Sequence, residues 1–149
     1  MTSPADGDLE PIRIVTEDAD LNGWVFTQGR RMTDILSAGE PFSFLAERDL
    51  THWREVIPDE TLFVIPPPHV SQPGLRLPGT KHRVLISAGS YQVAGTALLR
   101  PGEQDDPILR ATRRFLPLTD AVFRRGDGPE EQADVLIVNL RRTSSFEVE

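Results

Sequence analysis

The sequence predicts a mainly β fold of the α+β class, made of two tandem β-β-α-β-β copies, each of which can carry a fifth strand. Thirteen prolines and eleven glycines among 149 residues favour many turns and short strands over long helices. The order of features in residues 11–66 recurs in residues 82–149. A proline-rich connector at 67–81 separates the two stretches, as a spacer between two units would.

The self-similarity is clearest over the first two strands of each copy. Residues 12–26 (IRIVTEDADLNGWVF) align with residues 84–98 (VLISAGSYQVAGTAL) at a step of 72, which places Gly23 on Gly95. A glycine inside a strand pattern indicates a bulge or a sharp bend, and strongly bent strands are typical of small barrels. The shared glycine therefore predicts the same bend in both copies.

The alignment continues to the end of each copy with two one-residue shifts. A step of 73 places Phe42 on Phe115, and a step of 74 places residues 60–64 opposite residues 134–138. Few identities survive, but the features keep their order along the chain. We therefore interpret the sequence as a duplication.

The first copy contains five segments with secondary-structure signals. Short β-rich runs at 11–16 and 21–28 predict its first two strands, joined by an acidic hairpin turn. A short helical turn follows, which Thr33 can cap. Apolar runs at 42–48 and 61–65 then predict two further strands.

The second copy repeats this order. Its helix is expected from Pro107 to Arg114, with one of the two aspartates before the proline as its cap. The helical spacing predicts that Ile108 and Leu109 face the core. The strands predicted in this copy are 83–87, 91–99, 115–123, 134–140 and 144–148.

The size of each copy predicts that the two copies pack together. A unit of roughly 60–70 residues is marginal for independent stability. We expect small Sm-like or SH3-like barrels, or packed sheets, related by pseudo-twofold symmetry. The chain is divided into a disordered acidic arm at 1–10, a first β copy at 11–66, a proline-rich connector at 67–81 and a second β copy at 82–149.

Short apolar motifs carry a family resemblance. The stretch through Leu21-x-Gly23 to residues 31–36 (RMTDIL) resembles a family of small, functionally uncharacterised bacterial β-domain proteins. The ending at 136–140 (LIVNL), followed by residues 146–148, is similar to the closing segment of Sm-like barrels, which bind RNA as rings. The residues after Asn139 lack the glycine of the RNA-binding loop. The resemblance therefore implies a barrel and does not transfer RNA binding.

Composition and charge exclude several function classes. The chain has no cysteine, which excludes disulfides, iron–sulfur clusters and thiolate zinc sites. Residues 1–75 carry a net charge of −8 and residues 76–149 a net charge of +1. These unlike halves predict complementary docking within the chain or onto a protein partner, including self-association. No apolar run is long enough to span a membrane, so we expect a cytoplasmic protein.

The arginines of the second copy are the candidate ligand-binding residues. Arg110 and Arg114 have the spacing of the cyclic-dinucleotide-binding PilZ barrels, but the motif that follows in those barrels is missing. Together the arginines could form one basic face that binds a nucleotide or a nucleic acid. The candidates are Arg110, Arg113, Arg114, Arg124, Arg125, Arg141 and Arg142.

A calcium-loop-like pattern lies in the first hairpin. Asp18, Asp20 and Asn22, followed by Gly23, match the first positions of an EF-hand loop. The twelfth position is Gly29 where a bidentate glutamate belongs, and the flanks are predicted strands. We therefore interpret the segment as an acidic turn and expect no metal.

The predicted function is a non-enzymatic binding or assembly module that acts through protein–protein contacts and carries no cofactor. No phosphate-binding loop, dinucleotide fingerprint or nucleophile elbow occurs in the sequence. The alternative is nucleotide or nucleic-acid binding by the arginines of the second copy. An enzyme whose site forms only in three dimensions is the third hypothesis.

Overall fold

The computed structural model describes residues 9–46, 53–67 and 79–149. Most of the expected acidic arm and of the proline-rich connector lies outside these ranges. The strands are β1 (Leu9–Val15), β2 (Asp20–Phe26), β3 (Phe42–Leu45), β4 (Trp53–Val56), β5 (Phe63–Ile65), β6 (Thr80–Ala88), β7 (Tyr91–Leu99), β8 (Phe115–Arg125), β9 (Glu131–Asn139) and β10 (Thr143–Val148). The helices are α2 (Met32–Ser37), α3 (Pro107–Ala111) and two 3₁₀ turns, η1 (Pro58–Glu60) and η2 (Leu140–Arg142).

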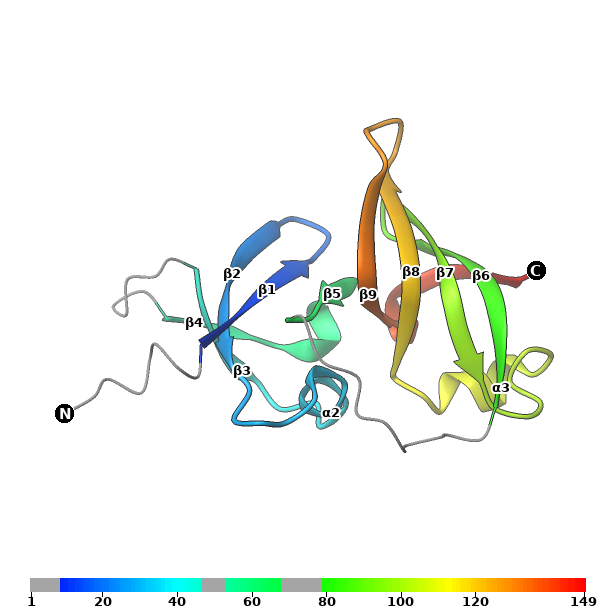
Figure 1. Ribbon diagram of the computed structural model, residues 1–149, viewed down its shortest axis with the longest axis horizontal. Helices are drawn as coiled ribbons and strands as arrows, with labels where there is room; N and C mark the ends of the chain where they lie inside the picture. The colour runs from blue at the N-terminus through cyan, green and yellow to red at the C-terminus, as the bar shows by residue number, and fades with distance from the viewer. Residues whose placement is uncertain (1–8, 47–52, 68–78) are drawn as a thin grey trace.

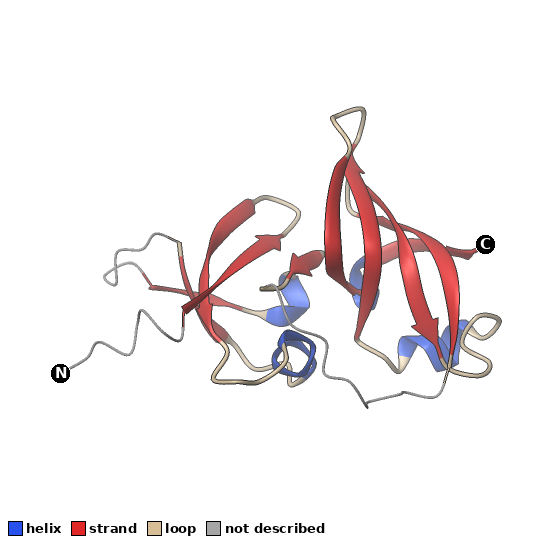
Figure 2. Ribbon diagram, in the orientation of Figure 1, coloured by secondary structure: helices blue, strands red, loops and turns tan. Residues whose placement is uncertain are grey.

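The ten strands form one curled antiparallel sheet, in the order β10-β6-β7-β8-β9-β5-β1-β2-β3-β4. The predicted mainly β class is therefore confirmed. Figure 1 shows α2 and α3 at the same end of the sheet, with the β8–β9 hairpin pointing the other way. Figure 2 shows how little of the described chain is helical.

The strand order is the same in residues 9–65, here called the first half, and residues 80–148, the second half. The first half has the order β5-β1-β2-β3-β4 and the second half the order β10-β6-β7-β8-β9. In each half an α-helix lies between the second and third strands, and a 3₁₀ turn precedes the fifth. The sequence did not predict β4, so the strand at 61–65 was taken for the fourth strand of its copy when it is the fifth. The alignment of residues 60–64 with 134–138 is therefore wrong. Strand β5 holds the position of β10, not of β9.

The strand registers also correspond between the halves. A step of 72 relates β1 and β2 to β6 and β7, a step of 74 relates β3 to β8, and a step of 82 relates residues 53–65 to residues 135–147. The step of 73 expected at Phe42 is therefore off by one. The register pairs that fix these steps are Ile12–Gly23 with Val84–Gly95, Ile14–Val64 with Ile86–Phe146, Val25–Phe44 with Ala97–Leu118, and Phe42–Val56 with Leu116–Val138.

The two halves meet where β5 pairs with β9, which we call the internal junction. Phe63 lies opposite Val138 and Val64 lies opposite Ile137. Each half also donates side chains to the other's core. Phe63 belongs to the cluster of the second half, whereas Ile137 and Phe115 belong to that of the first. The sheet and the core are therefore continuous across the internal junction.

The arrangement at the internal junction is head to tail. Strand β5 is the last strand of its half, whereas β9 is the fourth strand of its half. A twofold axis would bring identical positions together. The expected pseudo-twofold symmetry is thus not confirmed.

Helix α3 differs from its prediction. It ends at Ala111, and Ile108 and Leu109 are 82% and 41% exposed, so the expectation that they face the core is wrong. Asp106 caps the helix by accepting the N–H groups of both residues, at 2.9 and 3.2 Å. A helix of five residues makes little more than one turn, too short for the amphipathic stripe on which the prediction relied.

Candidate functional site

The open edges of the sheet are the first candidate site. The strand order ends at β4 on one side and at β10 on the other, and no strand in the described ranges pairs with their outer sides. The first three side chains of β4 are exposed, as are Ser144 and Ser145 on β10. An open edge presents unpaired backbone N–H and C=O groups, to which another strand can add.

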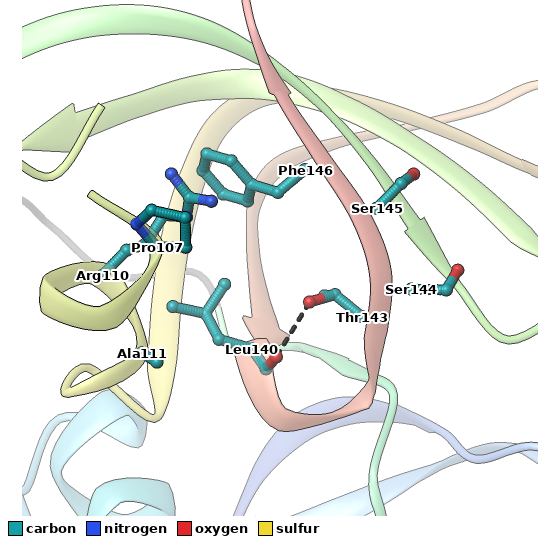
Figure 3. Close-up of a pocket in the computed structure, with 8 residues that line it drawn as sticks. All are labelled: Pro107, Arg110, Ala111, Leu140, Thr143, Ser144, Ser145 and Phe146. Atoms are coloured by element: carbon teal, nitrogen blue, oxygen red, sulfur yellow. Dashed lines mark hydrogen bonds between the residues drawn. The ribbon is translucent and has the colours of Figure 1, made fainter. Parts of the chain in front are cut away.

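A pocket of about 240 Å³ lies beside one of these edges, between α3 and β10 (Figure 3). The Arg110 guanidinium lies over the Phe146 ring, 4.0 Å from its centroid, and its Nη1 donates to the Glu103 carbonyl at 3.0 Å. The pocket therefore offers a cation beside an aromatic wall. Its lining residues are Pro107, Arg110, Ala111, Leu140, Thr143, Ser144, Ser145 and Phe146.

Asn139 is buried and joins the two halves by hydrogen bonds. Its side-chain nitrogen donates to the Thr61 carbonyl at 2.9 Å and to the Asp59 carbonyl at 3.2 Å. Its Oδ1 accepts the backbone N–H of Arg141 at 3.0 Å, and its own N–H donates to the Leu62 carbonyl at 3.0 Å. The side chain thus ties η1 to η2 across the internal junction.

Three of the seven candidate arginines converge on Asp59. The carboxylate lies 4.0 Å from Nη2 of Arg114 and 3.7 Å from Nη1 of Arg141. Arg142 donates its Nε–H to the Asp59 carbonyl at 2.9 Å. One acid of the first half therefore faces three cations of the second half.

Two further arginines surround Glu103, a buried acid on the loop before α3. Its carboxylate accepts the Arg100 backbone N–H at 2.6 Å and lies 3.1 Å from Nη1 of Arg113. Arg113 also donates to the Leu98 carbonyl at 3.0 Å, and Arg110 donates to the Glu103 carbonyl. A buried carboxylate needs such partners, so this cluster organises the loop.

Arg124 and Arg125 lie far from the other five, at the opposite end of β8. Arg125 is opposite Tyr91 in the register and donates its Nε–H to Ser90 Oγ at 3.3 Å. The structure therefore divides the seven arginines among three places. Those around Asp59 and Glu103 already contact a carboxylate or a carbonyl oxygen.

Asp20, one of the three calcium-loop-like residues, binds an arginine. Arg13 forms a pair of hydrogen bonds to Asp20, at 2.6 and 2.8 Å, and a second pair to Glu131 on β9, at 2.9 and 3.1 Å. The guanidinium keeps the pKa of Asp20 below its usual range. Asp18 is exposed in the turn, and no group of three metal-ligating side chains occurs in the part of the chain that the structure describes.

This pair makes stability depend on pH. A lowered folded-state pKa means that Asp20 stabilises the fold at neutral pH and loses that contribution as the pH falls through its pKa. We expect Asp20→Asn to lower the free energy of unfolding at neutral pH and to flatten its decline in acid. Urea titrations at several pH values measure both effects. Asp18→Asn is the control, expected to keep the wild-type profile, and an equal decline in wild type and Asp20→Asn would contradict the assignment.

Sequence reasoning missed Asp59, Glu103 and Asn139. Asp59 and Glu103 lie far along the sequence from the arginines that their carboxylates approach, and Asn139 drew attention only as part of an apolar segment. The one signal was compositional, since an acidic first half and an arginine-rich second half predict docking within the chain.

Comparison with protein-family models, curated proteins and solved structures gave no match. Within the described ranges, neither helix is long and apolar enough to cross a membrane. The strands and side chains described above are therefore the basis for inferring a function.

Proposed function

We propose that the protein is a non-enzymatic assembly module whose copies join head to tail, with β4 of one copy pairing with β10 of the next. The strand positions at the internal junction carry this proposal. There the fourth strand of one half, β9, pairs with the last strand of the other, β5. The open edges carry the same two positions, since β4 corresponds to β9 and β10 to β5. If two copies join in the way that the two halves join, β4 of one copy pairs with β10 of the next.

The register correspondence supports a duplicated unit and gives a definite pairing to expect between copies. At the internal junction Phe63 lies opposite Val138. The residue 82 positions after Phe63 is Ser145, and the residue 82 positions before Val138 is Val56. In what we call the intercopy junction, Val56 of one copy therefore lies opposite Ser145 of the neighbouring copy.

Charge supports the same placement. At the internal junction Asp59 faces Arg114, Arg141 and Arg142. At the intercopy junction Arg141 takes the place of Asp59. The positions of the three arginines are then held by acids of the neighbouring copy. Glu40 corresponds to Arg114 by the step of 74, and Asp59 and Glu60 correspond to Arg141 and Arg142 by the step of 82. Every sign is reversed, so attraction is kept.

A head-to-tail junction has a definite consequence for assembly. The two surfaces that meet are different, so every copy added leaves one β4 edge and one β10 edge free. Such contacts close into a ring or continue as a filament. The mass of the assembly distinguishes these outcomes.

The alternative function, nucleotide or nucleic-acid binding by the arginines, has weaker support. An extended polyanion site needs its cations on one face. The seven candidate arginines lie in three places, so they do not form one such face. Assembly accounts for the open edges, which nucleic-acid binding leaves unexplained.

Light scattering over a concentration series tests the proposal. We expect the mass of wild type to rise above that of one chain with concentration, to a fixed multiple for a ring and without a limit for a filament. Ser145→Lys is expected to remain a monomer, because it puts a charge opposite the apolar Val56 of the neighbouring copy. Ser145 is exposed in the single chain, so the melting temperature should change little.

Gln92→Lys is the matched control, since Gln92 is exposed on β7, an interior strand. It is expected to assemble like wild type. A wild-type protein that stays monomeric up to its solubility limit would contradict the proposal. So would an assembly that Ser145→Lys leaves intact.

A further inference from the structure

The internal junction is sealed by an apolar contact between α2, β5 and β9. Leu36, Val64 and Ile137 belong to one buried cluster, and none is more than 1% exposed. Val64 and Ile137 lie directly opposite each other in the register. Separating these surfaces would expose side chains that water solvates poorly, so this junction is permanent.

Two of the three corresponding positions at the intercopy junction are charged. The step of 82 replaces Val64 with Phe146 and Ile137 with Glu55. The step of 74 replaces Leu36 with Arg110, in agreement with the caps that end the two helices, at residues 38 and 112. An apolar pair at one junction thus becomes an arginine and a glutamate at the other.

The pocket in Figure 3 lies at these replaced positions, because Arg110 and Phe146 both line it. Phe146 forms one wall and Arg110 lies over its ring. The Glu103 carboxylate is held by Arg113, and Arg110 contacts the Glu103 carbonyl. Glu55 is exposed on β4, the strand expected to enter beside this pocket.

We propose that this pocket receives the Glu55 carboxylate of the neighbouring copy, which pairs with Arg110, so that salt controls assembly at the intercopy junction. This inference rests on the proposed head-to-tail assembly. A carboxylate entering the pocket leaves water and meets a guanidinium backed by an aromatic ring. This contact of the intercopy junction is then ionic and sensitive to salt, whereas the corresponding contact of the internal junction is apolar.

Two charge reversals, measured alone and mixed, test the pairing by sedimentation. Arg110→Glu puts a glutamate in the pocket and keeps Glu55, so its copies repel one another. Glu55→Arg keeps Arg110 and repels its own copies for the same reason. Each variant alone is expected to assemble about 30-fold more weakly or worse. An equal mixture is expected to assemble as alternating copies, because every pocket then meets an opposite charge.

The mixture also shows that both variants are folded, since misfolded chains would not rescue each other. Arg124→Glu, an exposed reversal at the far end of β8, is the matched control and should assemble like wild type. Added salt is expected to dissociate the wild-type assembly. Wild-type assembly without rescue in the mixture would overturn the pocket pairing and leave the assembly proposal standing. Absence of wild-type assembly would overturn both.

Discussion

Replacing Phe63 with alanine is expected to lower the free energy of unfolding of the whole chain by about 3–5 kcal/mol. The side chain lies on β5 in the first half and is fully buried in the core of the second half. Its ring centroid is 5.1 Å from that of Tyr91 and 5.3 Å from that of Phe123. The truncation leaves a cavity among aromatic neighbours that cannot collapse fully.

Chemical denaturation followed by far-UV circular dichroism and tryptophan fluorescence measures this loss. Both probes are expected to report one cooperative transition, because the two halves share a sheet and a core. Trp53→Ala is the control, since Trp53 is 40% exposed and stacks only on Phe26 among its described ring contacts, so about 1 kcal/mol is at stake. Two separate transitions, with one unaffected by Phe63→Ala, would contradict the shared core.

Gly23→Ala is expected to destabilise the fold by about 3 kcal/mol, the upper end of the usual cost of overpacking. A Cβ at this position would lie 2.3 Å from the Leu45 carbonyl oxygen and 2.4 Å from Cζ of Phe44. The backbone oxygen cannot move without breaking the β2–β3 pairing. Gly95→Ala should cost less, because the nearest atom is Leu118 Cβ at 2.8 Å and the backbone oxygen is 3.4 Å away.

Thermal and urea unfolding of both glycine variants measures this ranking. Asn22→Ala, an exposed neighbour on the same strand, is the control and should change stability by less than about 0.5 kcal/mol. If Gly23→Ala unfolds like wild type, the close approach of β2 and β3 is not present in solution.

The two glycines explain why the fold class could be predicted. Each marks a place where a neighbouring strand approaches too closely for a side chain, and that constraint leaves a glycine in the sequence. In both halves the added Cβ would meet a side chain and a carbonyl oxygen at corresponding positions, Phe44 and Leu45 in one and Leu118 and Thr119 in the other. Alternating apolar runs around them were sufficient to place most of the strands.

Strand β4 could not be predicted because it lacks an apolar pattern. Three of its four side chains are exposed, as expected at the edge of a sheet, and charged residues replace the alternation that indicates a strand. Missing it shifted the end of the first copy by one strand, which paired residues 60–64 with the wrong partner. The edge proposed for assembly was therefore the part of the sheet with the weakest sequence signal.

The arginine contacts were missed for a different reason. Arg141 and Asp59 are 82 residues apart, and only the pairing of β5 with β9 brings them together. Residue type identified Arg141 as a candidate, but its partner depends on the strand order. The length of β8 separates Arg124 and Arg125 from the other five candidates, which composition had placed on one face.

Disulfide trapping tests the head-to-tail assembly most directly, because the chain has no cysteine of its own. The Asn139–Leu62 hydrogen bond makes the neighbouring Phe63–Val138 a non-hydrogen-bonded pair. Its counterpart, Val56 opposite Ser145 of the neighbouring copy, should therefore have Cα atoms about 4.5 Å apart, within the range for a disulfide.

Oxidised Val56→Cys/Ser145→Cys protein is expected to give covalent multimers on a non-reducing gel that collapse to one chain on reduction. Val56→Cys/Glu147→Cys is the register control and should stay a single chain, because Glu147 is exposed two residues further along the regular part of β10, which puts the two Cα atoms about 7–8 Å apart, too far for a disulfide. Multimers from the first variant alone are the result that the head-to-tail pairing requires. No multimers from the first variant, or equal multimers from both, would contradict it.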